Sequence, residues 1–403
     1  MNISPVELQN LKVVLAHDWL TGMRGGERVL EYLCRMFPQA PIYTLFYNPA
    51  AVSDTIKSHE IITSPLQKIP GILKFYRNLL PFFPSAMESL QPEKADLVIS
   101  TSHCVAKGLI APKGARHLCY CFTPMRYAWV FYEEYFGRNP LKKMALSAML
   151  RRLRAWDVAS SAKIDCFVTL SRHVQKRIRD FYGREAEVVH PPVNLEFWKP
   201  EQNTSAFDRN QNYFNGGRTF GEPISERLGP ASPSNFVANL SYDLVVSALV
   251  PYKRIDLAVK AYNKLGYPLK IAGTGTEAAK LRKMAADNIA FLGRVSDEQL
   301  LDLYRNCRAL VFPGEEDFGI VPLEAQSCGK PVVAFARGGV LETVVRDQTG
   351  VFFDEQNEDA LLDAVGRCAS RQWDPAVIRN NAARFSEKNF IDGIKACIEK
   401  CLK

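Results

Sequence analysis

The stretch that decides the fold spans residues 315–344 and reads EEDFGIVPLEAQSCGKPVVAFARGGVLETV. The apolar run ALVFP at 309–313 precedes it and predicts a buried strand. VPLEAQSC at 321–328 predicts a helix, because its proline suits a first turn and Gly329 suits the end. PVVAFA at 331–336 predicts a second strand. The order strand, loop, helix and strand indicates an α/β domain.

Two glutamates flank the start of this helix. Glu316 lies in the loop before it and Glu324 lies inside it, with seven residues between them. A helix N-terminus presents free N–H groups and a positive dipole, which favour a phosphate. A carboxylate on each side of that point can accept hydrogen bonds from sugar hydroxyls. The arrangement predicts a nucleotide-sugar site, whereas a solvated helix face is the plain alternative for any two glutamates.

The spacing and its flanking residues resemble the signature of the family 4 retaining glycosyltransferases, which have the GT-B fold. In this sequence the signature comprises Glu316, Glu324, Gly329, Pro331, Val332, Val333, Gly338, Gly339 and Glu342. The resemblance implies an α/β protein of the GT-B class, with two Rossmann-like, doubly wound parallel-sheet domains facing a central cleft. It also implies that the first glutamate contacts the transferred sugar and the second contacts the ribose of the nucleotide.

Five further residues of this half of the chain are predicted to bind the substrate. Four lie where the loop becomes the helix, and one is the second-last residue of the short strand IAFLGRV at 289–295. They are Phe318, Gly319, Ile320, Val321 and Arg294.

Length and composition set the class of protein. At 403 residues the chain exceeds one ordinary core, so two domains are expected. The net charge of +8 fits an anionic partner such as a nucleotide or a membrane surface, and no nucleic-acid partner is predicted. Ten cysteines without metal-ligand spacing favour buried thiols in a reducing cytoplasm, with no metal or cofactor. The sequence shows neither a signal pattern nor a run of about 20 apolar residues.

Composition also divides the chain. We expect an N-terminal Rossmann-like, acceptor-binding domain at 1–200 and a C-terminal Rossmann-like, nucleotide-sugar-binding domain at 239–385. Residues 201–238 between them are rich in Asn, Ser, Gly and Pro, which predicts a poorly ordered linker or insertion. The last helix, at 386–403, is expected to cross back toward the N-terminal domain, as it commonly does in GT-B proteins.

The N-terminal half opens on a strand, a glycine loop and a helix. LKVVLAHDWL at 11–20 predicts the strand, and TGMRGGE supplies the loop. Gly25 and Gly26 do not form the G-x-G-x-x-G fingerprint, so a dinucleotide site is not supported. A tight turn would explain two glycines equally well. The resemblance instead implies that they bind substrate, near the donor diphosphate and the acceptor.

Two cations follow the first strand of the C-terminal half. Lys253 and Arg254 stand between a strand and a helix, where they can neutralise a diphosphate, although a Lys-Arg pair alone is most often solvated surface. The family usually has an arginine at the strand end and a lysine five residues later. Lys253 matches the lysine, whereas Ala248 holds the arginine position. Arg254 is therefore predicted to supply the missing charge, and both cations are predicted to be catalytic with Glu316.

A second departure concerns a histidine. Many members of the family carry one in the turn after the corresponding N-terminal strand, but here the residues read Cys-Phe-Thr with Phe122 in that place. His103 is then the predicted catalytic histidine, and His17 a predicted substrate-binding one. A structural role is the alternative for each.

Two segments are candidates for meeting a membrane. LKKMALSAMLRRLRA at 141–155 predicts a basic amphipathic helix, and residues 72–83 interleave aromatic and basic side chains. Ordinary core packing and a solvated helix face are the alternatives. The lipid-acceptor members of the family use such a surface on the N-terminal domain, which favours attachment to the inner face of the cell membrane.

The implied activity is the metal-independent transfer of a hexose from a nucleoside diphosphate sugar, with retention of configuration. Several blocks resemble bacterial mannosyltransferases of polysaccharide assembly, so GDP-mannose is the expected donor and a glycan or a lipid-linked molecule the acceptor. A GT-B sugar-nucleotide epimerase is one alternative, with Asp18, Glu27 or Asp96 as its acids. An inactive nucleotide-sugar-binding scaffold is the other, since Ala248 and Phe122 depart from the pattern.

Overall fold

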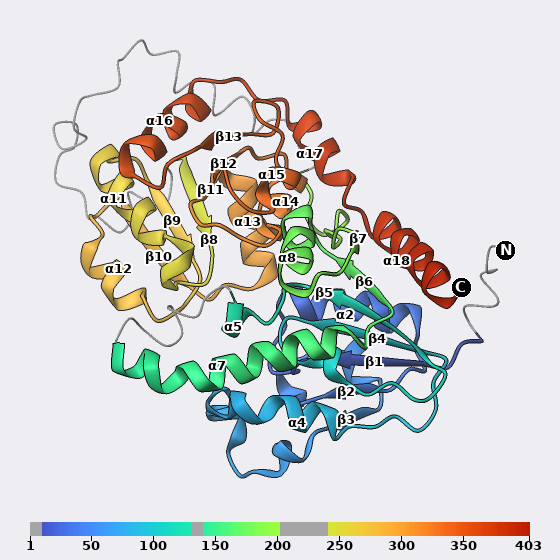
Figure 1. The fold of residues 1–403 in the computed structure, drawn as a ribbon. Helices are drawn as coiled ribbons and strands as arrows, with labels where there is room; N and C mark the ends of the chain where they lie inside the picture. The colour runs from blue at the N-terminus through green and yellow to red at the C-terminus, as the bar shows by residue number, and fades with distance from the viewer. Residues whose placement is uncertain (1–9, 130–139, 202–240) are drawn as a thin grey trace. The chain divides into compact units, whose positions relative to one another are not determined.

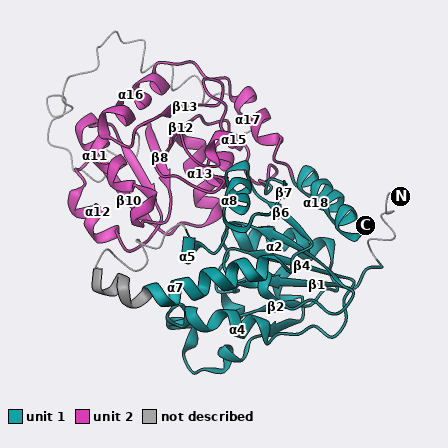
Figure 2. Ribbon diagram, in the orientation of Figure 1, with its two compact units in different colours: residues 1–192, 387–403 teal, residues 193–386 magenta. Residues whose placement is uncertain are grey.

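The computed structural model describes residues 10–129, 140–201 and 241–403, without the side chains of 140–146. Except for residue 201, the predicted insertion at 201–238 lies outside the described residues. The chain divides into two compact units: unit 1 comprises residues 1–192 and 387–403, and unit 2 comprises residues 193–386 (Figure 2).

Unit 1 is built on a parallel sheet of seven strands in the order β3-β2-β1-β4-β5-β6-β7 (Figure 1). The strands are β1 (Val13–His17), β2 (Ile42–Thr44), β3 (Ile61–Thr63), β4 (Leu97–Ser102), β5 (Arg116–Cys121), β6 (Cys166–Thr169) and β7 (Ala186–Val188). The order reverses between β1 and β4, which pair from Val13 opposite Leu97 to His17 opposite Thr101. In doubly wound sheets, ligands bind outside the carboxyl ends of the strands at such a reversal.

Helices connect these strands. The α-helices are α2 (Gly25–Met36), α3 (Asp54–Lys57), α4 (Phe83–Glu88), α5 (Arg126–Trp129), α7 (Pro140–Ser161), α8 (Arg172–Tyr182) and α18 (Glu387–Leu402). The 3₁₀ helices are η1 (Pro49–Ala51), η2 (Pro65–Lys68), η3 (Ile72–Lys74), η4 (Tyr76–Phe82) and η5 (Ala106–Gly108). The basic helix expected at 141–155 is thus part of a longer helix, α7.

The last helix, α18, packs on the sheet of unit 1. The ring of Phe390 lies 5.8 Å from that of Tyr32 in α2 and 5.9 Å from that of Tyr120 in β5. Lys400 near its end forms an ion pair with Glu187 of β7. The final segment of the chain therefore completes the core of the unit that contains the N-terminus.

Unit 2 repeats the plan with a parallel sheet of six strands in the order β10-β9-β8-β11-β12-β13. The strands are β8 (Tyr242–Val246), β9 (Leu269–Ala272), β10 (Ile289–Gly293), β11 (Cys307–Phe312), β12 (Val332–Phe335) and β13 (Gly350–Phe353). The helices are η8 (Pro251–Lys253), α11 (Ile255–Leu265), α12 (Ala278–Met284), α13 (Asp297–Asn306), α14 (Ile320–Ser327), α15 (Val340–Thr343), α16 (Glu358–Ala369) and α17 (Pro375–Ala383). The order reverses between β8 and β11.

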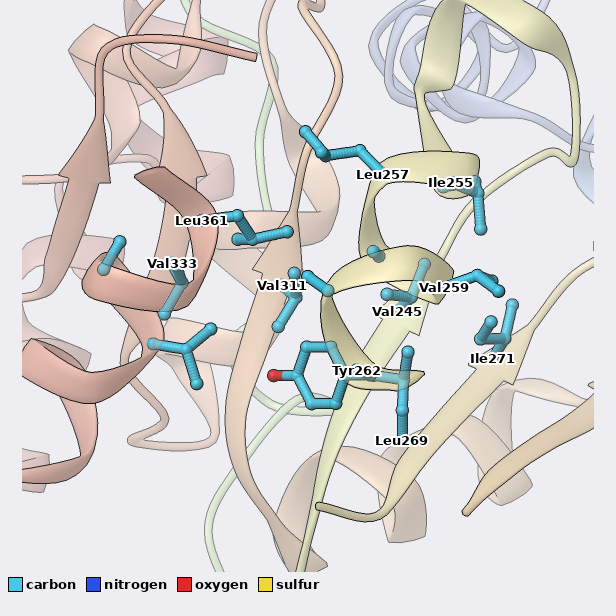
Figure 3. Close-up of a cluster of buried hydrophobic side chains, with 14 of the residues drawn as sticks. Val245, Ile255, Leu257, Val259, Tyr262, Leu269, Ile271, Val311, Val333 and Leu361 are labelled. Atoms are coloured by element: carbon cyan, nitrogen blue, oxygen red, sulfur yellow. The ribbon is translucent and has the colours of Figure 1, made fainter. Parts of the chain in front are cut away.

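The core of unit 2 lies between its sheet and helices α11 and α16. Val245, Ile271 and Val311 of the sheet pack in one buried cluster with Val259 and Tyr262 of α11 (Figure 3). Burying such a side chain contributes about 1.5–3 kcal/mol, so this cluster anchors the strands whose carboxyl ends carry the predicted site. The prediction of two doubly wound parallel sheets is confirmed.

Candidate functional site

In unit 2 the loops that follow β8, β11 and β12 approach one another at glycines. A Cβ atom on Gly314, after β11, would lie 2.8 Å from the carbonyl oxygen of Lys253. One on Gly338, after β12, would lie 2.3 Å from the carbonyl oxygen of Glu316, and Gly338 also has a φ of +80°. Only glycine fits such contacts without a shift of backbone, so these residues bring the loops together.

Two of the predicted residues, Lys253 and Glu316, form an ion pair. Their side chains are 12% and 27% exposed, so the pair is largely shielded while still reachable from solvent. The backbone of Glu316 is held as well, since its carbonyl oxygen accepts the N–H of Gly339 at 2.8 Å. A cation and a carboxylate thus lie side by side at the carboxyl ends of β8 and β11.

Arg254 is engaged elsewhere in the structure. Its Nε donates to Asp256 at 3.2 Å and one terminal nitrogen donates to Gln356 at 3.1 Å. Its φ of +53° ends η8 and begins α11, so its side chain diverges from that of Lys253. For Arg254 to reach a diphosphate these contacts would have to open, and its catalytic role stays a prediction.

Glu324 lies inside α14 and is buried. Its Oε2 accepts the hydroxyl of Tyr304 in α13 at 2.9 Å, and Tyr304 stacks edge-on against Trp198 at 5.5 Å. Burial, followed by the charge and hydrogen bond of Glu324, raises the pKa of Tyr304 well above its ordinary value, so the hydroxyl remains a donor. Tyr304 therefore fixes the orientation of Glu324, a partner that no spacing in the sequence indicated.

The remaining predicted residues of unit 2 lie around α14 and α13. Phe318 is buried edge-on against Phe385 at 5.8 Å, Gly319 caps the start of α14, and Ile320 and Val321 form its first turn. Arg294 follows β10 and lines a pocket of about 610 Å³ with residues of α13. Helix α13 thus carries both Tyr304, which holds Glu324, and one wall of this pocket.

In unit 1 the reversal point of the sheet brings an aspartate and a histidine together. Asp18 follows β1 and His103 follows β4, and Nδ1 of His103 lies 2.8 Å from Oδ2 of Asp18. The carboxylate, which is fully buried, also accepts the backbone N–H groups of four successive residues at 2.6–3.1 Å. Burial by itself would raise the pKa of Asp18, but the charge and hydrogen bond of His103 lower it well below its usual range.

His17 and the glycine loop lie beside this pair. Nδ1 of His17 and the hydroxyl of Thr101 are 2.7 Å apart, and burial lowers the pKa of His17 to about 4, so the ring is neutral near pH 7. A Cβ on Gly26 would lie 3.3 Å from the ring of Phe122 and 3.5 Å from that of His17. Gly25, by contrast, starts α2 with open space around it. Phe122, which stands at the position where the family usually has a histidine, therefore packs its ring beside Gly26.

The acids considered for an epimerase occupy different places. Glu27 is buried in the first turn of α2, where burial raises the pKa of its carboxyl group, and it accepts the N–H of Arg24 at 3.1 Å. Asp96 instead precedes β4 and accepts the N–H of Lys12 at 2.8 Å. Asp96 therefore lies at the amino ends of the strands, opposite the edge that carries His17. Of the three acids, only Asp18 and Glu27 lie at the carboxyl edge.

Two family models match the chain. Residues 23–197, mainly in unit 1, match the model described as Glycosyltransferase Family 4. Residues 234–385, within unit 2, match the model described as Glycosyl transferases group 1.

Curated relatives and solved structures agree with these matches. A D-inositol 3-phosphate glycosyltransferase of Acidothermus cellulolyticus is 29% identical over 59% of this chain and 53% of the relative. A GDP-mannose-dependent phosphatidylinositol monomannoside mannosyltransferase of Mycolicibacterium smegmatis is 28% identical over 52% of this chain and 53% of the relative. The chain spans about half the length of the curated relatives it matches.

The structure of HepE from Anabaena, solved in complex with UDP and glucose, shares the fold. It superposes with a TM-score of 0.66, covering 96% of this chain and 99% of that one at 16% identity.

Proposed function

We propose that this chain is a glycosyltransferase that moves a hexose from a nucleoside diphosphate sugar. Its GT-B fold and the match of its two units to glycosyltransferase family models support the proposal. The observation that carries the proposal is the Lys253–Glu316 pair at the carboxyl ends of β8 and β11. A diphosphate needs a cation, and the hydroxyls of a sugar need an acceptor that holds them in place. The pair presents both within one loop cluster.

The surrounding residues fit the other parts of such a donor. The first turn of α14, with Gly319 and Ile320, would offer its free backbone N–H groups to a phosphate. Glu324, oriented by Tyr304, would accept hydroxyls of the ribose. Arg294 and the pocket on α13 would receive the base. Gly25 and Gly26 of unit 1 are proposed to bind substrate, as the resemblance implies.

The chemistry asked of unit 2 is electrostatic. As the bond between the sugar and the diphosphate stretches, negative charge builds on the leaving group, and Lys253 with the α14 dipole stabilises it. Glu316 would then exchange its ion pair for contacts with the transferred sugar. Within the described ranges no three His, Cys, Asp or Glu side chains group as metal ligands. The proposal is a retaining, metal-independent transfer.

GDP-mannose is the proposed donor, because a relative matched over half of this chain is named as GDP-mannose-dependent. The fold relative solved with UDP and glucose makes UDP-sugars the first competitors to test. The proposed acceptor is a glycan or a lipid-linked molecule of bacterial polysaccharide assembly.

One surface of unit 1 supports a lipid-linked acceptor. Between residues 61 and 87 there is no acidic residue, and the segment exposes four large apolar side chains together with three basic ones. They are Ile69, Leu73, Phe75 and Phe82, with Lys68, Lys74 and Arg77. Among the described residues no helix is both long and apolar enough to cross a membrane. We propose peripheral attachment at the cytoplasmic face of the membrane through this aromatic and basic surface.

A donor panel tests the proposal. The full chain is incubated with GDP-mannose, UDP-glucose or UDP-galactose, each labelled in the sugar, and with a bacterial lipid extract as acceptor, with and without EDTA. We expect EDTA-resistant label in the lipid phase, most from GDP-mannose, and an α-linkage by NMR. An epimerised donor would establish the epimerase instead. If neither a labelled lipid nor an epimerised donor forms, the inactive nucleotide-sugar-binding scaffold is the alternative that remains.

A further inference from the structure

We propose that Tyr304 is a positioning residue that presets Glu324 to select nucleotides with an intact ribose. The tyrosine holds one oxygen of the carboxylate, so that the glutamate is already oriented to accept the two ribose hydroxyls, and nucleotides that lack these hydroxyls are rejected. This inference rests on the proposed function, in which Glu324 accepts hydroxyls of the ribose, and it concerns unit 2 alone.

The contact between the two side chains has one direction. The hydroxyl of Tyr304 in α13 lies 2.9 Å from Oε2 of Glu324 in α14, and both side chains are buried. An ionised carboxylate is acceptor-only, so the phenol is the donor. Burial, followed by the charge and hydrogen bond of Glu324, keeps the pKa of Tyr304 well above its ordinary value. The phenol therefore keeps its proton, and the hydrogen bond persists across the pH range of an ordinary assay.

The donor is itself fixed in place. The ring of Tyr304 is fully buried and packs edge-on against Trp198, at 5.5 Å between centroids and 83° between planes. Its helix is tied to the sheet one residue earlier, where the hydroxyl of Tyr242 in β8 donates to the carbonyl of Leu303 at 3.1 Å. A donor that cannot move imposes its own geometry on the carboxylate that it contacts.

The helix that carries the glutamate is equally constrained. Residues 322–327 of α14 are all buried, and the side-chain amide of Gln326 donates to the carbonyl of Thr343 at 2.9 Å. The backbone at Glu324 is therefore set by packing. What freedom remains lies in the side-chain torsions of the glutamate, and the hydrogen bond from Tyr304 restricts them.

A preset carboxylate suits a ligand with two adjacent hydroxyls. Its two oxygens offer about four acceptor sites, of which Tyr304 takes one. The 2′ and 3′ hydroxyls of ribose lie on the same side of the ring, so both can donate to one carboxylate. Because the side chain is ordered before the ligand arrives, binding loses little side-chain entropy. A site built to bond such hydroxyls discriminates strongly against analogues that lack them.

A purely structural role of Tyr304 is the alternative. Its hydroxyl would then only satisfy a buried carboxylate, and its loss would lower the stability of the chain without changing the preference for ribose. The two roles differ in one measurable quantity, the affinity for a nucleoside diphosphate divided by the affinity for its 2′,3′-dideoxy counterpart. We call this quantity the ribose ratio.

Calorimetric titration measures the ribose ratio, with the nucleoside diphosphate that the donor panel selects. Tyr304→Phe removes the hydroxyl and keeps the ring. Tyr242→Phe is the matched control, since it removes another hydroxyl that bonds the same helix, at the carbonyl of Leu303. Glu324→Ala and its double variant with Tyr304→Phe complete a mutant cycle. Thermal unfolding establishes that each variant is folded.

We expect a wild-type ribose ratio of at least about ten, the lower end for hydrogen bonds to a charged group. Tyr304→Phe should lower the ratio to about three or less, because the carboxylate is no longer preset. Tyr242→Phe should keep the wild-type ratio. In Glu324→Ala the ratio should be near one, and adding Tyr304→Phe should change neither affinity further. Replacing Tyr304 by 4-aminophenylalanine, which restores a donor, should restore the wild-type ratio.

Contrary outcomes are distinct. A wild-type chain that neither transfers sugar nor binds a nucleoside diphosphate overturns the proposed function and this inference together. With an active wild type, the inference alone is overturned by a wild-type ratio near one, by a folded Tyr304→Phe that keeps the wild-type ratio, or by an equal loss in Tyr242→Phe. If Tyr304→Phe does not fold, the 4-aminophenylalanine variant decides: a wild-type ratio supports the inference and a ratio near one overturns it.

Discussion

Replacing either member of the Lys253–Glu316 pair should separate donor binding from turnover. In Lys253→Ala a diphosphate loses a largely shielded cation, whose side chain is only 12% exposed. A hydrogen bond to a charged group contributes about 1.5–3 kcal/mol. At about 1.4 kcal/mol for each factor of ten, nucleoside diphosphate should bind roughly 10 to 150 times more weakly.

Glu316→Gln should act in the opposite sense on binding. Without the carboxylate, the ammonium group no longer has to exchange an ion pair for the diphosphate. A partly exposed pair contributes about 0–1 kcal/mol, so affinity should be unchanged or up to about fivefold higher. Turnover should nevertheless fall about 100-fold, because the sugar loses the acceptor that holds it in the transition state.

Calorimetric titration and transfer kinetics on the two variants and their double mutant provide the measurement. Lys264→Ala is the control, since that exposed lysine of unit 2 also pairs with a glutamate, Glu358. If Glu316→Gln weakened nucleotide binding as much as Lys253→Ala, the pair would be a structural unit and the assigned roles would be wrong.

Four further outcomes are expected. Glu324→Ala should weaken nucleoside diphosphate binding by about 1.5–3 kcal/mol in calorimetry, and unchanged affinity in a folded variant would reassign it. Arg254→Gly keeps a residue that suits the positive φ, and it should lower the transfer rate at least tenfold, which is about 1.4 kcal/mol in activation free energy. Full activity of this variant would mean that Arg254 has no catalytic role. Burial lowers the pKa of His117 to about 4, so as the pH falls His117 is protonated in the unfolded chain before it is protonated in the folded one. Urea unfolding should therefore show stability falling from about pH 6.5 toward pH 4, by up to roughly 1.4 kcal/mol per pH unit for this group, and His117→Asn should reduce that slope. Liposome sedimentation should show salt-sensitive binding to anionic vesicles that Phe82→Ser and Arg77→Glu each reduce about fivefold, near 1 kcal/mol, and binding that ignores lipid charge would count against this surface.

Local sequence signals predicted the framework of unit 2 well. The apolar run before residue 315 is β11, and the helix expected from Val321 extends from Ile320 to Ser327. Both depend on hydrophobic runs and on proline and glycine preferences, which act over a few residues. Preferences that act over a few residues could not show the contact between Lys253 and Glu316, although each was predicted as a site residue from its own motif.

Other contacts had no signal in a single sequence. Glu324 was placed on a helix correctly, but its partner Tyr304 comes from another helix that shows no motif. That Arg254 supplies charge for the diphosphate stays a prediction, and its contacts with Asp256 and Gln356 likewise had no signal in the sequence. Adjacent residues diverge where the backbone changes from one helix to the next, and that geometry is not written in the residue order.

The sequence by itself determined two parallel-sheet domains and a loop with carboxylates at its mouth, because strand, helix and turn preferences are local. Only the tertiary structure decided that Asp18 binds His103. Those residues are 85 positions apart, and they meet because β1 and β4 are neighbours at the point where the strand order reverses. Side chains that are distant in the chain become partners through strand order and register, which depend on the packing of the whole sheet.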